Sequence, residues 1–112
     1  MERLVAYRQA GVDPAYMGIA PVRATCAALK RAGLTSTSSS RSRHMRAHAL
    51  GFDPGKPHPN NNSIFLGHPV GTTGAIITTK LVYELHRIGG RYGLVMMCIG
   101  GSQGIAAIWE RV

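Results

Sequence analysis

The segment Gly67-His68-Pro69-Val70-Gly71-Thr72-Thr73-Gly74 leads into a long apolar helical pattern in this 112-residue chain. The segment Met97-Cys98-Ile99-Gly100-Gly101-Ser102-Gln103-Gly104 then joins two apolar stretches. The first places a histidine, which titrates near neutral pH, in a loop entering a helix. The second places a thiol at the end of a strand, beside a glycine-rich turn whose backbone N–H groups can face a ligand. Together they predict a functional site.

Each segment also has a simpler structural interpretation. A single cysteine in an apolar strand is usually a small core residue, and a glycine-rich link between strands is usually a hairpin turn. Taken separately, neither residue pattern therefore predicts function, and it is the pair that favours a site.

Helical spacing predicts helices over 21–32 and 72–88. Pro21 suits a first helical turn and Gly33 a helix end, and Cys26 is expected to pack with Val22 and Leu29 rather than to act as a reactive thiol. Thr72 is the predicted N-cap of the second helix, and Gly89-Gly90 ends it. Its expected inner face comprises Ile77, Leu81, Leu85 and Ile88, and its expected outer polar face Lys80, Glu84 and Arg87.

Strands are predicted over 92–99 and 104–110. The first is apolar at both parities, as in a strand covered on both faces, and the two are expected to form an antiparallel pair against which helix 72–88 packs. Residues 1–20 carry the apolar patch Leu4-Val5-Ala6-Tyr7, which indicates either a strand or an irregular lead-in. The expected fold class is α/β, with helices packed on a small mixed sheet.

Residues 36–48 have a different composition. Small hydroxyl residues followed by alternating arginine cannot bury apolar surface, which predicts a linker or a disordered segment. His44, His48 and His58 lie in or near it, but a zinc site needs about four ligands at defined spacing. No metal site is predicted, and solvated histidines are expected.

Composition limits the function classes. Thirteen Lys and Arg against five Asp and Glu give a net charge of +8, which is compatible with nucleic acid, an anionic membrane surface or a phosphorylated ligand. The excess is diffuse, with one tight cluster at Arg41, Arg43 and Arg46. Two cysteines fit a reducing compartment, and no apolar run approaches the roughly 20 residues of a membrane span. A single-domain cytoplasmic protein is expected.

Several blocks of the sequence resemble one family. Ile64-Phe65-Leu66-Gly67-His68-Pro69, Gly89-Gly90-Arg91-Tyr92-Gly93 and Met97-Cys98-Ile99-Gly100-Gly101 are similar to the C-terminal end of thiolases, the acyltransferases that make or cleave 3-ketoacyl-CoA. A second block, Val12-Asp13-Pro14-Ala15-Tyr16-Met17-Gly18-Ile19 with the helix to Leu34-Thr35, resembles the same domain. The resemblance fails over 36–48, where the family has a strand ending in Asn-Glu-Ala-Phe and then a helix. A deletion, a shifted reading frame or a rewritten insert would each explain this.

The resemblance divides the domain into 1–35, an aberrant linker and Pro/Gly loop at 36–60, and 61–112 with the catalytic-loop helix and the terminal strand pair. It implies that His68 activates the acyl-carrying cysteine and helps to bind the thioester oxygen. Cys98 would be the general acid/base, and the amide of Gly100 would belong to an oxyanion hole. The nucleophilic cysteine lies in the family's N-terminal half, and Cys26 is in the wrong block to replace it.

The expected function is therefore that of a thiolase C-terminal fragment, inactive alone, with a coenzyme A thioester as substrate and no bound cofactor. A complementary N-terminal half or a homo-oligomer is the expected partner, and no membrane or nucleic acid is expected. The alternative is a small basic binding module for RNA or acidic partners that uses Arg41, Arg43 and Arg46. Such modules interleave aromatic and basic residues, and the nearest aromatic residue here is Phe52.

Overall fold

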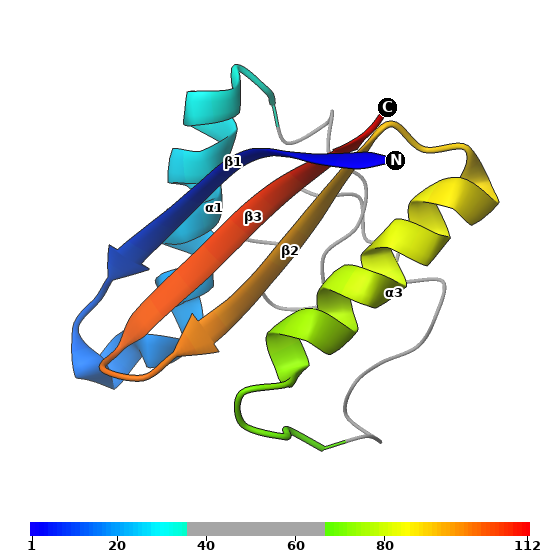
Figure 1. Ribbon diagram of the computed structural model, residues 1–112. Helices are drawn as coiled ribbons and strands as arrows, with labels where there is room; N and C mark the ends of the chain where they lie inside the picture. Colours follow the sequence, from blue (N-terminus) through cyan, green and yellow to red (C-terminus); the bar gives the residue numbers. More distant parts are fainter. Residues whose placement is uncertain (36–66) are drawn as a thin grey trace.

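The computed structural model describes residues 1–35 and 67–112, in which a three-stranded sheet has helices on its two faces (Figure 1). The linker, the three histidines and the arginine cluster discussed above lie outside these residues. The elements in chain order are β1 Glu2–Gly11, the 3₁₀ helix η1 Pro14–Ile19, α1 Ala20–Ala32, α3 Thr73–Ile88, β2 Tyr92–Ile99 and β3 Gln103–Arg111. None of the helices in the described part is long and apolar enough to cross a bilayer.

The strand order is β1-β3-β2, and both neighbouring pairs are antiparallel. The predicted pair 92–99 and 104–110 is confirmed, and the N-terminal patch forms a full strand rather than an irregular lead-in. We expected a mixed sheet, whereas the sheet formed by residues 1–35 and 67–112 is antiparallel. The difference arises because β1 pairs with β3, which runs against both of its neighbours.

Helix α1 packs directly on the central strand β3. Ala24 and Ala28 are fully buried against Ala106 and Ile108, and these small side chains let the helix approach closely. Gly104 marks the closest approach, because a Cβ atom there would lie 2.3 Å from the backbone nitrogen of Pro21. No side chain larger than hydrogen fits at that position without moving the helix.

The packed face of α1 differs from our expectation. Cys26 is exposed, so the prediction that it packs in the core was wrong. The buried residues of the helix are Ala20, Pro21, Ala24, Thr25, Ala28 and Leu29. Leu29 is buried and Val22 packs against the core, as predicted, so the expectation fails at Cys26 alone. Alanines make up much of the inner face, where the helix lies close to the sheet. The predicted end holds, since Gly33 caps the helix with φ 66°.

Helix α3 covers the opposite face of β2. Leu81 lies against Gly93, where an added Cβ would come within 2.5 Å of a Leu81 methyl carbon, and Leu85 is 2% exposed. Glu84 was predicted to be on the outer face, but it is 7% exposed and accepts two hydrogen bonds from Arg87, at 2.8 and 2.7 Å. Its charge is accommodated because the guanidinium pairs with both carboxylate oxygens.

The helix ends also test the sequence predictions. Thr72 occupies the N-cap position of α3, although its side chain makes no capping hydrogen bond. Gly89 ends the helix in the left-handed conformation, with φ 66°. The helix boundaries were therefore predicted well, while the capping role of the Thr72 hydroxyl was not.

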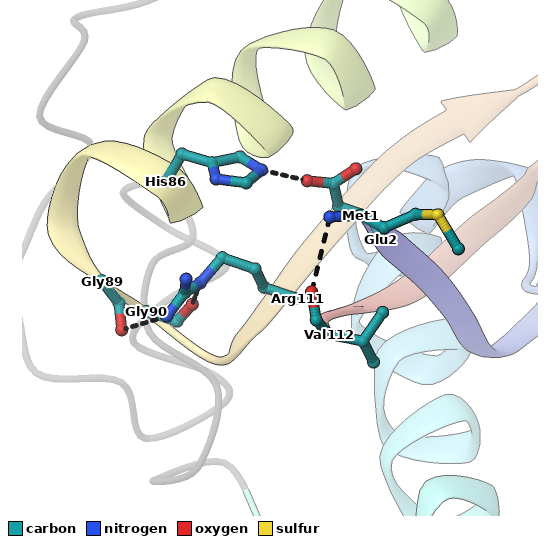
Figure 2. A network of polar contacts seen from close by, with 7 residues as sticks. All are labelled: Met1, Glu2, His86, Gly89, Gly90, Arg111 and Val112. Carbon is teal, nitrogen blue, oxygen red and sulfur yellow. Dashed lines mark hydrogen bonds and ion pairs between the residues drawn. The ribbon is translucent and has the colours of Figure 1, made fainter.

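A polar network joins the chain termini and the end of α3 (Figure 2). The backbone N–H of Val112 donates to the carbonyl of Met1 at 2.9 Å. Arg111 donates to the carbonyls of Gly90 and Gly89 at 3.0 and 3.3 Å, and His86 contacts Glu2. These contacts fasten β1 and β3 to the C-terminal end of α3.

Glu110 holds the same end of the sheet together. Its carboxylate is buried on β3 and pairs with Arg3 on β1 and with Arg91, which precedes β2. Hydrogen bonds from Arg3, and next from Arg91, keep the pKa of Glu110 below its ordinary value of 4.5. One carboxylate thus links all three strands.

Candidate functional site

The loop 67–72 that carries His68 has a geometry set by its own residues. Gly67 and Gly71 adopt φ values of 71° and 86°, a region that residues with a side chain rarely occupy. Pro69 fixes a third φ angle near −65°. Its carbonyl oxygen accepts hydrogen bonds from the backbone N–H groups of Thr72 and Thr73, at 3.0 and 3.1 Å. The loop therefore delivers an exposed imidazole to the start of α3 in a defined conformation.

The imidazole of His68 contacts the first residue of the helix. Its Nδ1 lies 2.7 Å from Oγ1 of Thr73, and that hydroxyl donates to the carbonyl of Pro69 at 3.2 Å. The side chain is thus anchored through Nδ1. Sequence reasoning missed Thr73, because it considered Thr72 as the capping residue; the hydroxyl at the first helical position was the available signal.

Cys98 lies near the end of β2, opposite Gly104 of β3. It shares the strand parity of Leu94 and Met96, which pack towards α1, and its half-buried Sγ lies 3.8 Å from the carbonyl of Met17 in η1. Gly104 lies directly against the start of α1. Since Cys98 pairs with Gly104, the position of its thiol depends on how α1 packs on the sheet. The weak S–H···O contact orients Sγ towards η1.

The turn between β2 and β3 has two consecutive left-handed residues, Gly101 with φ 71° and Ser102 with φ 58°. The carbonyl of Ser102 accepts a hydrogen bond from the N–H of Val12 at 3.0 Å, which ties the turn to the segment after β1. Gly100 is exposed, and an added Cβ there would meet no atom within 4 Å. Among the described residues, no atom therefore occupies the space beside its Cα; the oxyanion role of its amide stays a prediction.

The elements that carry the three predicted residues converge at one end of the domain. Helix α3 and strand β2 run in opposite directions, so the start of α3 lies at the end where β2 finishes (Figure 1). A Cβ atom on Gly74 would lie 3.7 Å from Sδ of Met97, the residue before Cys98. His68 approaches this end from the α3 side, whereas Cys98 lies on the face towards α1. Imidazole, thiol and turn amide are groups suited to proton transfer and to stabilising a developing oxyanion.

Comparison with known proteins shows which family the chain resembles. Residues 1–111 match the family model described as "Thiolase, C-terminal domain". The chain is 53% identical over 121 residues to the beta-ketothiolase BktB of Cupriavidus necator, with 100% of this chain and 31% of that protein covered. It is 42% identical to the mitochondrial 3-ketoacyl-CoA thiolase of Bos taurus, over 98% of this chain and 30% of the relative.

Solved structures give the same result. The crystal structure of human mitochondrial 3-ketoacyl-CoA thiolase in complex with CoA superimposes with a TM-score of 0.89 at 40% identity. The superposition covers 99% of this chain and 30% of the human protein's chain. The acetyl-CoA acetyltransferase of Bacillus anthracis also has a TM-score of 0.89, at 33% identity. The chain thus spans about 30% of the length of the proteins that it matches.

Proposed function

We propose a role in acyl transfer for this chain, which belongs to the thiolase family as its C-terminal domain. It supplies His68, Cys98 and Gly100 to an active site that moves acyl groups between coenzyme A thioesters. The observation that carries the proposal is the convergence of the His68 loop and the end of β2, seen in the proximity of Gly74 to Met97. The relative solved with CoA supports a coenzyme A thioester as the substrate. We expect that no separate bound cofactor is needed.

Each residue has a role that suits its position. In thiolysis, a nucleophilic thiolate attacks the ketone carbonyl of a 3-ketoacyl-CoA, and the C–C bond breaks to leave an enolate. The thiol of Cys98 protonates that enolate, and the resulting thiolate then takes the proton of incoming CoA. The CoA thiolate attacks the acyl group left on the nucleophile, which releases the shortened acyl-CoA and regenerates the nucleophilic thiolate. His68 accepts the proton of the nucleophile and afterwards faces the thioester oxygen. The backbone N–H of Gly100 donates a hydrogen bond to the carbonyl oxygen that becomes negative when the nucleophile attacks.

The nucleophile has to come from outside the described residues. The two cysteines of the sequence are Cys26 and Cys98; Cys98 is assigned the acid/base role, and Cys26 is exposed on α1, outside the predicted site residues. We therefore propose that an N-terminal thiolase domain completes the site. A homo-oligomer would not supply the nucleophile, because each copy of this chain carries the same two cysteines. Two cysteines, too few for a disulfide scaffold, suit the reducing cytoplasm that we expect for this chain.

The isolated 112-residue chain is expected to show no thiolysis of acetoacetyl-CoA, because no acyl-enzyme can form without the nucleophile. The positive test is a chimera that keeps residues 1–35 and 67–112 and takes the preceding domain and the intervening segment from the beta-ketothiolase of Cupriavidus necator. This chimera is expected to turn over. His68→Ala and Cys98→Ala should each lower kcat/KM by about 10²–10⁴-fold, the usual contribution of a general acid or base.

The matched control is Cys26→Ala, since that thiol is exposed and unused in the proposal. It should leave turnover unchanged. A chimera that is active and insensitive to both His68→Ala and Cys98→Ala would overturn the assignment of the site. Activity of the isolated chain that disappears in both variants would overturn the need for a second domain.

A further inference from the structure

We propose that Thr73 is a positioning residue that fixes His68 in the tautomer with the proton on Nδ1 and the lone pair on Nε2. This inference extends the proposed function, since it says which nitrogen of His68 is free to accept a proton. It rests on the contact pattern His68–Thr73–Pro69, which the described residues contain in full.

The hydroxyl of Thr73 has one proton and two neighbours. Oγ1 lies 2.7 Å from Nδ1 of His68 and 3.2 Å from the carbonyl oxygen of Pro69. The carbonyl can only accept, so the Thr73 proton serves it best, and Nδ1 must then donate to Oγ1. In the reverse arrangement the hydroxyl donates to Nδ1, and the two oxygens lie 3.2 Å apart with no proton between them. The arrangement with Nδ1–H satisfies both contacts, and the reverse satisfies one.

The rest of the loop holds the hydroxyl in place. Thr73 is the first residue of α3, and its own backbone N–H donates to the same Pro69 carbonyl at 3.1 Å. The side chain and the main chain of one residue thus share an acceptor, which restricts the rotation of the hydroxyl. Since His68 is exposed and anchored through Nδ1, its Nε2 is the nitrogen left to meet a nucleophile or a thioester oxygen.

The decisive measurement is the tautomer of His68 in the full 112-residue chain, read from long-range ¹H–¹⁵N correlation spectra above the pH at which the ring is charged. A His68→Gln variant identifies the signals of this ring among the five histidines. We expect a pyrrole-like Nδ1 and a pyridine-like Nε2. Thr73→Val, which keeps the shape and removes the hydroxyl, should shift the tautomer ratio about fivefold to tenfold towards Nε2–H, the effect of losing one hydrogen bond.

Two controls separate positioning from general stability. Thr73→Ser keeps a hydroxyl and should restore the original ratio, and Thr79→Val, at an exposed position of the same helix, should leave it unchanged. In the chimera described above, Thr73→Val should lower kcat more than it changes KM, with Thr73→Ser restoring it.

The proposal is overturned if the wild-type ring is mainly Nε2–H, a result that needs no variant to fold. It is also overturned if Thr73→Val keeps the Nδ1–H form. The tautomer is measured without turnover, so an inactive chimera would count against the proposed function and leave this inference standing.

Discussion

The two faces of the sheet are packed in different ways. On the α1 face, alanines and Gly104 bring backbone against backbone, and Ala24, Ala28, Ala106 and Ile108 are all fully buried. On the α3 face, long side chains such as Leu81 fill the space, and Glu84 and Leu85 are the buried residues of the described helix. A backbone contact cannot adjust, whereas long side chains can repack.

This difference separates the supports of the two candidate catalytic groups. Cys98 lies opposite Gly104 on the tightly packed face, and His68 is held by its own loop at the start of α3. Changes to the α1 face should therefore disturb both the fold and the thiol. Changes to the α3 face should be milder.

The largest expected effect is that of Gly104→Ala. An added Cβ would lie 2.3 to 2.7 Å from backbone atoms of Ala20 and Pro21, so α1 would have to move, at a cost of about 3 kcal/mol or more. The matched variant is Gly74→Ala, whose Cβ would make an ordinary 3.7 Å contact with Met97 in a helix that favours alanine. Urea denaturation should show a large loss of stability for the first and none for the second, and equal losses would remove the contrast between the two faces.

A smaller contrast is expected when each face loses one side chain. Ile108→Ala removes a fully buried group from the α1 face and should lower the free energy of unfolding by about 3–4 kcal/mol. Leu81→Ala acts on a half-buried residue of α3 and should cost roughly 1–2 kcal/mol. Both losses can be measured from denaturant midpoints, with the slope of the unfolding free energy against denaturant concentration unchanged. A larger loss for Leu81→Ala would show that α3 supplies more of the core than its exposure indicates.

The smallest expected effect concerns pH. The pKa of Glu110 is lowered in the folded state by Arg3 and Arg91, so the unfolded chain binds this proton more readily. The stabilisation is complete above the ordinary pKa of 4.5 and declines as the pH falls through and below that value. Urea midpoints measured from neutral to acid pH should therefore fall less steeply in Glu110→Gln. An identical slope in the variant would show that packing alone holds this end of the sheet.

Particular residues show how far the sequence could predict the fold. The helices and the β2–β3 pair followed from periodicity and from glycine at the helix ends, which are local signals. The face of α1 was predicted in part: Val22 and Leu29 pack against the core, whereas Cys26 was misplaced because much of the contact surface is alanine, which carries little hydrophobic signal. Glu84 was misplaced because its pairing with Arg87 allows a carboxylate to be buried, and helical spacing alone does not reveal such a pair.

The candidate site, too, could be predicted only in part from the sequence. His68, Cys98 and Gly100 were named from sequence motifs and resemblance, and their roles stay predictions. The Thr73 contact depends on how the loop folds back at Pro69, which residue type alone does not specify. The sequence left open whether the first residues form a strand or an irregular lead-in. They form β1 because they pair with β3, a strand about a hundred residues away in the chain.

The meeting of Met1 and Val112 has a practical consequence. Their backbones are joined by a hydrogen bond of 2.9 Å at the end of the sheet remote from the His68 loop. A short peptide linking these two residues would give a circular backbone without rearranging a strand. Circularisation restricts the unfolded ensemble more than the native one, so such a ring should resist heat better than the open chain.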